Sequence, residues 1–121
     1  MDTSGPAPGV VITGPDGRVI ADRVRWARTR RERIRGLIGS RPLEPAEALI
    51  IEWARGVHTF KMTYAIDVVI CDASWVVRHV VCGMQPARIT RPVLRARYVL
   101  ELPEGSATEL EVGDRLRVGA S

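Results

Sequence analysis

The stretch from Val57 to Cys71 holds the densest mixture of reactive and apolar side chains in this 121-residue chain. His58 is one of two histidines, Lys61 is the only lysine, and Asp67 stands at the start of an apolar run. A histidine beside a carboxylate can bind an anion or move a proton. Two interpretations of His58 are therefore open: a cleft histidine oriented by Asp67, or a buried neutral histidine that bonds a backbone carbonyl or a carboxylate.

An extended conformation of residues 57–62 favours the buried interpretation. Side chains alternate along a strand, so His58, Phe60 and Met62 would share one face and His58 would have apolar neighbours. Asp67 and Glu101 lie within apolar runs and need hydrogen-bond donors, which favours structural roles for both. Five residues are the candidates for a ligand-binding pocket: His58, Lys61, Met62, Asp67 and Glu101.

Catalytic and metal chemistry have less support. The sequence contains neither a Gly-x-Ser-x-Gly elbow nor a cysteine–histidine signature, so no catalytic residue is assigned. His58, His79 and Asp67 lack the spacing that prearranges ligands for a metal ion. We therefore expect no metal and no cofactor.

Arginines are concentrated between residues 23 and 41, where eight occur with only Asp22 and Glu32 as acidic residues in or beside the segment. Such a stripe can contact nucleic-acid phosphates. A solvated helix face is favoured, because no aromatic residue is interleaved in the basic helix and no nucleic-acid-binding module is recognisable. The net charge of +4 bears on solubility and attraction to anions rather than on fold.

Composition indicates a soluble globular protein, with 45% hydrophobic and 26% charged residues. No apolar run approaches the roughly 18 residues of a spanning helix, so we expect no membrane association. The N-terminus has no signal-peptide pattern, which makes the cytoplasm the default location. Residues 1–9 are predicted to be a flexible tail, and residues 10–121 a single globular domain.

Turn signals and β-rich runs predict a mainly β protein. The turn at residues 13–17 predicts a hairpin between residues 10–12 and 18–21, with the strand resuming through residues 24–26. Further strands are expected at residues 48–51, 66–71, 75–81, 98–102 and 115–118, the last as an edge strand. Together with one helix they predict an α+β fold on a mostly antiparallel, barrel-like sheet.

One short amphipathic helix is predicted at about residues 29–39. Thr29 and Glu32 have the spacing of a capping box, in which each side chain bonds the other's backbone amide. Ile34, Leu37 and Ile38 form one apolar stripe, and Gly39 is a natural stop.

Cys71 and Cys82 do not form a disulfide framework and are expected to be buried and reduced. A two-residue loop at residues 73–74 would pair Cys71 with Val76 and Ala65 with Cys82. The cysteines would then lie six residues apart along the hairpin, roughly 20 Å at about 3.3 Å per residue, too far for a bridge.

Four ordered motifs over about residues 19–118 resemble those of one family. They are Glu32-Arg33-Ile34-Arg35-Gly36-Leu37, Val57-His58-Thr59-Phe60-Lys61-Met62 with Ile66-Asp67-Val68-Val69, Tyr98-Val99-Leu100-Glu101-Leu102-Pro103-Glu104-Gly105, and Val112-Gly113-Asp114. The family is domain of unknown function 192 (DUF192), the uncharacterised ACR proteins. The resemblance implies a compact, mainly β fold and no established activity.

The chain departs from the family pattern at a few positions. Methionine is usual at the position of Ile38, and phenylalanine is common at those of Ile50 and Ile70. Lys61 stands where glycine or tryptophan is frequent, so a pocket here would differ in charge.

Three hypotheses for function follow. The first is a non-enzymatic binding module with a pocket for a small polar or anionic ligand around His58 to Asp67. The second is an arginine-rich adaptor for nucleic acid or an acidic protein. The third is a hydrolase that uses a histidine–carboxylate set.

Overall fold

A computed structural model describes residues 10–120 of the chain, so the predicted tail at residues 1–9 lies outside the described residues. It contains eight strands and one α-helix within that range. In chain order these are β1 (Val10–Thr13), β2 (Val19–Ala21), β3 (Arg23–Ala27), α1 (Arg30–Arg35), β4 (Glu47–Glu52), β5 (Ile66–Cys71), β6 (Val77–Met84), β7 (Tyr98–Pro103) and β8 (Arg117–Ala120).

The strands form two separate sheets. The larger has the order β3-β4-β7-β5-β6, and the smaller the order β2-β1-β8. Every strand pair is antiparallel except β3–β4, which is parallel. The mostly antiparallel α+β prediction is confirmed, whereas the barrel-like part is not, because the described strands do not close into one barrel.

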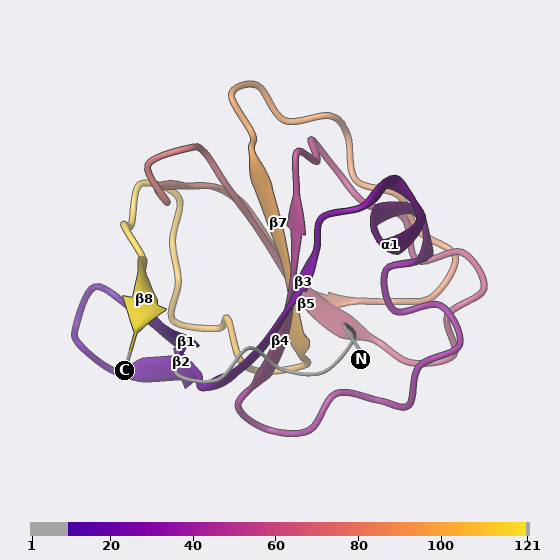
Figure 1. Cartoon of the computed structure of the whole chain (residues 1–121), viewed down its shortest axis with the longest axis horizontal. Coiled ribbons are helices and arrows are strands. Elements are labelled where there is room, and N and C mark those ends of the chain that lie inside the picture. Colours follow the sequence, from indigo (N-terminus) through magenta and orange to yellow (C-terminus); the bar gives the residue numbers. More distant parts are fainter. Residues whose placement is uncertain (1–9, 121) are drawn as a thin grey trace.

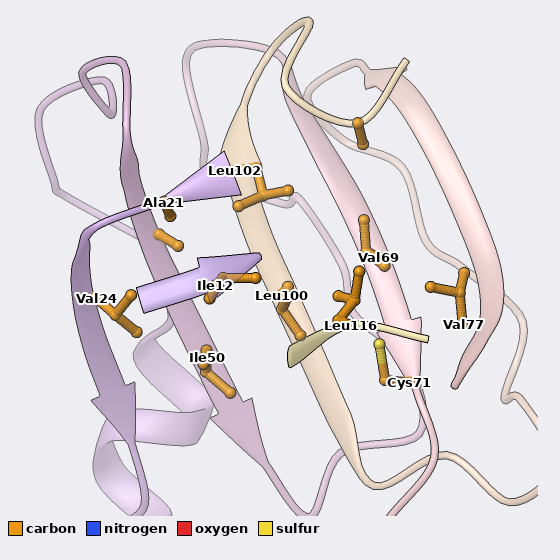
Figure 2. Close-up of a cluster of buried hydrophobic side chains, with 12 residues drawn as sticks. Ile12, Ala21, Val24, Ile50, Val69, Cys71, Val77, Leu100, Leu102 and Leu116 are labelled. Atoms are coloured by element: carbon orange, nitrogen blue, oxygen red, sulfur yellow. The ribbon is translucent and has the colours of Figure 1, made fainter. Parts of the chain in front are cut away.

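The larger sheet is covered on both faces (Figure 1). The small sheet lies on one face and α1 on the other. Between the two sheets lies an apolar core that includes Ile12, Ile50, Leu100 and Leu102, all fully buried (Figure 2). A second core, which includes Leu37, Met62 and Val68, lies on the face beneath α1. Because both faces of β5 are covered, all six of its residues are buried, as expected for an apolar run in a central strand.

The predicted β1–β2 hairpin is confirmed, with an irregular register after Ile12. The strand predicted to resume through residues 24–26 is confirmed as β3, but β3 does not extend the hairpin, because it belongs to the larger sheet and pairs with β4. β8 is an edge strand, as predicted, and pairs with β1. None of the described helices is long and apolar enough to cross a membrane.

Helix α1 begins as the capping box predicts. The Thr29 hydroxyl accepts from the Glu32 amide at 3.1 Å, and the Glu32 carboxylate accepts from the Thr29 amide at 3.0 Å. The helix is shorter than predicted, because Gly36 and not Gly39 ends it, with φ of +51°. A positive φ at Gly36 turns the chain down onto the sheet, so Leu37 is buried outside the helix.

The β5–β6 hairpin departs from the predicted register by bulges. Cys71 pairs with Val77 rather than Val76, and Ile66 pairs with Met84. Cys82 therefore lies near Asp67, four residues from Cys71 along β5 and not six. Both thiols are free, and Cys82 is exposed, so the prediction that both cysteines are buried is wrong for Cys82.

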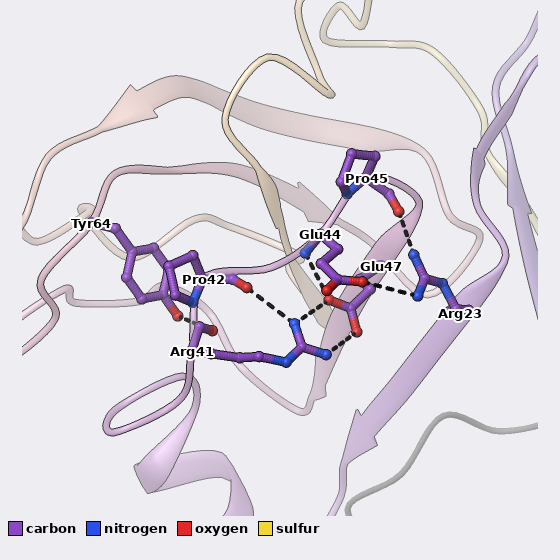
Figure 3. A network of polar contacts seen from close by, with 7 residues as sticks. All are labelled: Arg23, Arg41, Pro42, Glu44, Pro45, Glu47 and Tyr64. Atoms are coloured by element: carbon purple, nitrogen blue, oxygen red, sulfur yellow. Dashed lines mark hydrogen bonds and ion pairs between the residues drawn. The ribbon is translucent and has the colours of Figure 1, made fainter.

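A polar network fixes the connection that leads from α1 into β4 (Figure 3). The Arg41 guanidinium donates to both Glu47 carboxylate oxygens, at 2.8 and 3.0 Å, and the Glu44 amide donates to the same carboxylate at 2.7 Å. The Tyr64 hydroxyl donates to the Arg41 carbonyl at 3.2 Å. Arg41 holds the pKa of Glu47 down at about 2.

Candidate functional site

A cavity of about 360 Å³ lies on the α1 face of the larger sheet. Four segments line it: residues 30 and 33–38 of α1 and the turn after it, residues 51, 53 and 54 at the end of β4, residues 56–58 and 62, and Glu101 of β7. Its volume is in the range of small-molecule sites. Three of the four sequence motifs contribute to its walls.

Glu101 forms the buried base of this cavity. Its side chain is 1% exposed, and its Oε2 has no hydrogen-bond partner among the described residues. Burial raises the pKa of Glu101 from 4.5 to about 8, because an apolar environment disfavours the carboxylate. At neutral pH the group is therefore mainly a neutral acid that can donate a hydrogen bond.

The surroundings of Glu101 are set by the sheet and by α1. Glu101 pairs with Leu49 of β4 on one side and Val68 of β5 on the other. Above it, a Cβ on Gly36 would lie 3.5 Å from Glu101 Oε1, so the turn after α1 packs directly on the carboxyl group. Gly36 therefore packs closely against one of the five candidate pocket residues.

Apart from Glu101, apolar side chains line the cavity near its base and arginines line its rim. Ile34, Leu37 and Ile38, the predicted stripe, all line it, and Ile34 is 64% exposed. The stripe therefore faces the cavity and does not form a continuous core contact. Arg30 and Arg33 line the rim, and neither forms an ion pair with any residue from 10 to 120.

Residues 57–62 do not form a strand, so the alternation that an extended conformation would give does not apply. A backbone bridge joins His58 to Ile89, and a turn follows in which the Met62 amide donates to the Thr59 carbonyl at 3.2 Å. Thr59 is fully buried: its hydroxyl donates to the Gln85 carbonyl at 2.7 Å and accepts from the Arg88 amide at 2.9 Å.

A second threonine, Thr90, fastens the same wall. Its hydroxyl accepts from the Val57 amide at 2.9 Å. A Cβ on Gly56 would come within 2.7 Å of that hydroxyl, so the two loops approach closely only because residue 56 is glycine. Two buried threonines thus hold one wall of the cavity against the loop at residues 85–91.

His58 and Met62 are the other predicted site residues that line the cavity. Met62 is buried, whereas His58 is exposed and its ring stacks on Phe60 at a centroid distance of 5.2 Å. The favoured interpretation of a buried histidine is therefore wrong. His58 lies at the mouth of the cavity, where its ring nitrogens can exchange hydrogen bonds with solvent or a ligand.

Asp67 lies outside the cavity and has a structural set of partners. It is fully buried and accepts from the backbone amides of Gly83, Gly105 and Ala107 at 2.8, 3.0 and 2.8 Å. These bonds tie β5 to the bulge of β6 and to the turn after β7. Asp67 therefore does not orient His58.

Lys61 also lies outside the cavity lining. It is exposed, and its φ of +67° lies in the left-handed region that favours glycine. This conformation gives a physical reason for the frequent glycine at the corresponding position of the family pattern.

Trp53 is a further cavity residue that no motif in the sequence indicated. Its side chain is 63% exposed and lines the cavity, and the Arg97 guanidinium lies 3.7 Å from its ring centroid. The only available signal was its position directly after a buried strand.

Among the described residues, no group of three His, Cys, Asp or Glu side chains can hold a metal ion.

Two solved structures share this fold. A protein of unknown function from Novosphingobium aromaticivorans matches with a TM-score of 0.75 and 22% identity, over 89% of this chain and 82% of its own. A protein of Sinorhizobium meliloti, described as a proposed transcription regulator, matches with a TM-score of 0.73 and 22% identity, over 90% of this chain and 91% of its own. At this identity the likeness shows the fold alone.

A comparison with curated proteins finds none that matches this chain. The family model of DUF192, the uncharacterised ACR proteins, matches residues 11–118, nearly the whole of the described range. The motifs that line the cavity and anchor the sheet lie within that match. The chain therefore belongs to the DUF192 family of uncharacterised ACR proteins.

Proposed function

We propose that this protein is a binding module whose cavity takes a small polar or anionic molecule. The observation that carries the proposal is the Glu101 carboxyl group, buried at the base of an open cavity with Oε2 unpartnered among residues 10–120. Burying such a group without a partner costs free energy, and a ligand that supplies the partner recovers it. Perturbed groups in cavities are candidates for functional sites for this reason.

The polarity of the cavity supports a neutral or anionic ligand over a cation. Arg30 and Arg33 add positive charge at the rim, and a protonated Glu101 adds none at the base. His58 supplies a further polar group at the mouth, and Met62 an adaptable apolar wall.

Thermal-shift screening of small carboxylates, phosphates and sugars tests the proposal. Binding at a ligand concentration a hundredfold above Kd stabilises the folded state by roughly 2.7 kcal/mol. Glu101→Leu removes the donor and is expected to abolish the shift, whereas Glu111→Gln, at an exposed site away from the cavity, keeps it. A panel in which no compound stabilises the wild type would count against a ligand pocket.

An arginine-rich adaptor for nucleic acid is the second candidate. Its support is that Arg30, Arg31, Arg33 and Arg35 all lie on the six residues of α1, without an ion pair to the described residues. The structural neighbour described as a proposed transcription regulator is consistent with it. Fluorescence anisotropy with labelled DNA and RNA at two salt concentrations tests it, because phosphate contacts predict affinity that falls steeply with salt.

A further inference from the structure

We infer that the ligand is a planar aromatic carboxylate that carries a hydroxyl or carbonyl group at the end opposite its carboxylate. The inference rests on the proposed function and gives its ligand a chemical class. It combines three features of the cavity: an indole at the wall, an acid at the base and free arginines at the rim.

Trp53 is held as a platform by the ends of β4 and β7. Its amide donates to the Arg97 carbonyl at 2.7 Å, and the Ala54 amide donates to the same oxygen at 3.3 Å. Arg97 covers one face of the indole from 3.7 Å and does not line the cavity, whereas Trp53 does. A planar ligand in the cavity would stack on the indole face opposite Arg97, and the guanidinium restrains the orientation of the ring.

The backbone of Trp53 is in an uncommon conformation, with φ of +62°. A tryptophan in the left-handed region costs free energy, and such positions persist where the surroundings over-determine them, often at ligand sites. An exposed indole held this way is not explained by core packing, because the side chain is 63% exposed.

Both aromatic rings and sugars stack on tryptophan. The side chains of the cavity walls favour an aromatic ring. Between the base and the rim the cavity is bounded by aliphatic side chains, among them Ile34, Leu37 and Ile51. A sugar has hydroxyl groups around its edge, which would lose water there without gaining partners. The edge of an aromatic ring has no such groups.

The base and the rim together orient the ligand. At the base, protonated Glu101 offers one hydrogen bond to a neutral oxygen, and the apolar surroundings that keep it neutral also disfavour a second buried charge. At the rim, Arg30 and Arg33 have no ion-pair partner among residues 10–120 and can pair with a carboxylate in water. The hydroxyl or carbonyl end therefore points inward and the carboxylate outward.

Isothermal titration calorimetry on the full chain at neutral pH tests this arrangement with four probes. We expect 4-hydroxybenzoate to bind most tightly, benzoate to bind about tenfold more weakly because it leaves Glu101 unpaired, and cyclohexanecarboxylate and glucuronate to bind more weakly still. Trp53→Ala should weaken 4-hydroxybenzoate binding by about tenfold or more, whereas Trp53→Phe retains most of the affinity.

Substitutions of the rim arginines test where the carboxylate of the ligand lies. Arg30→Gln and Arg33→Gln should weaken 4-hydroxybenzoate binding severalfold but leave the neutral 4-hydroxybenzyl alcohol unaffected, and Arg31→Gln, on the same helix outside the cavity lining, should change neither. Tighter binding of glucuronate, or full affinity in Trp53→Ala with unchanged circular dichroism, overturns the aromatic assignment while the binding function stands. Absence of binding by all probes overturns the inference, and the broader thermal-shift panel then decides the proposed function separately.

Discussion

Asp67 and Glu101 occupy adjoining positions on paired central strands, yet their side chains leave the sheet on opposite faces. In the β5–β7 register Glu101 pairs with Val68 and Asp67 pairs with Leu102. Because side chains of paired residues share a face, Glu101 lies with the α1 face and Asp67 with the face of the small sheet. Glu101 therefore belongs to the cavity, whereas Asp67 holds backbone segments of the fold together.

Asp67→Asn should destabilise the fold without changing the cavity. An amide keeps one acceptor oxygen but turns an NH₂ group toward backbone donors, so we expect a loss of about 2–4 kcal/mol in the free energy of unfolding by urea. Asp22→Asn, on an exposed loop, is the control and should change little. An equal effect of both substitutions would contradict the role assigned to the three amide bonds.

The stability of the wild type should fall as pH rises between about 4.5 and 8. In this window the unfolded state releases the Glu101 proton while the folded state keeps it, because burial raises the folded pKa to about 8. The unfolded state then binds fewer protons, so the contribution to the slope is negative and at most about 1.4 kcal/mol per pH unit. Glu101→Gln should remove this contribution.

Tyr64 is an ionisable group near Glu101, and Glu101 contributes to raising the pKa of Tyr64, after burial. The pKa of Tyr64 is raised from 10.0, so Tyr64 titrates above the window and does not imitate the Glu101 transition. Urea titrations at several pH values on the wild type and on Glu101→Gln and Glu111→Gln measure the effect. A slope retained in Glu101→Gln would assign the pH dependence to another group.

Glu47 should lower the free energy of unfolding as the pH falls into the acid range, which is the opposite pH dependence to that of Glu101. Arg41 lowers its pKa from 4.5 to about 2, so its contribution to stability is complete above 4.5 and is lost as pH falls toward 2. Glu47→Gln should cost about 1–2 kcal/mol at neutral pH and less at pH 2. Glu44→Gln, which removes only the exposed ion pair with Arg23, should cost under about 1 kcal/mol.

Gly56→Ala should loosen the wall that contains His58. The new methyl group would lie 2.7 Å from Thr90 Oγ1 and 3.3 Å from the Arg91 carbonyl, so the two loops must separate at a cost of about 1–3 kcal/mol. Gly119→Ala meets nothing within 4 Å and is the matched control. Ligand affinity should fall with stability in the first variant only.

Local patterns predicted the elements better than their assembly. The capping box at Thr29 and the run from Ile66 to Cys71 are determined by neighbouring residues, and both are confirmed. The parallel pairing of β3 with β4 and the bulges of β6 depend on contacts distant in sequence, so no local pattern contains them. The helix ended early because Gly36 meets the sheet, which is a tertiary constraint.

The site was predicted in part for the same reason. Glu101 was noticeable as a carboxylate between two leucines, and the apolar run on both sides of it was enough to expect burial. His58 was judged from an extended backbone, whereas the turn held by Thr59 exposes it. Trp53 was missed because side-chain type favours the core, and neither its exposure nor its positive φ is contained in the pattern of neighbouring residues.

The parallel pairing of β3 with β4 obliges the chain to cross over between them, and residues 28–46 of that crossing carry α1, which walls the cavity. Parallel neighbours need such a long connection. Glu101, in contrast, is fixed in a central strand. The cavity is thus built from two independent parts: the crossing segment forms one wall, and the register of the sheet fixes the acidic base.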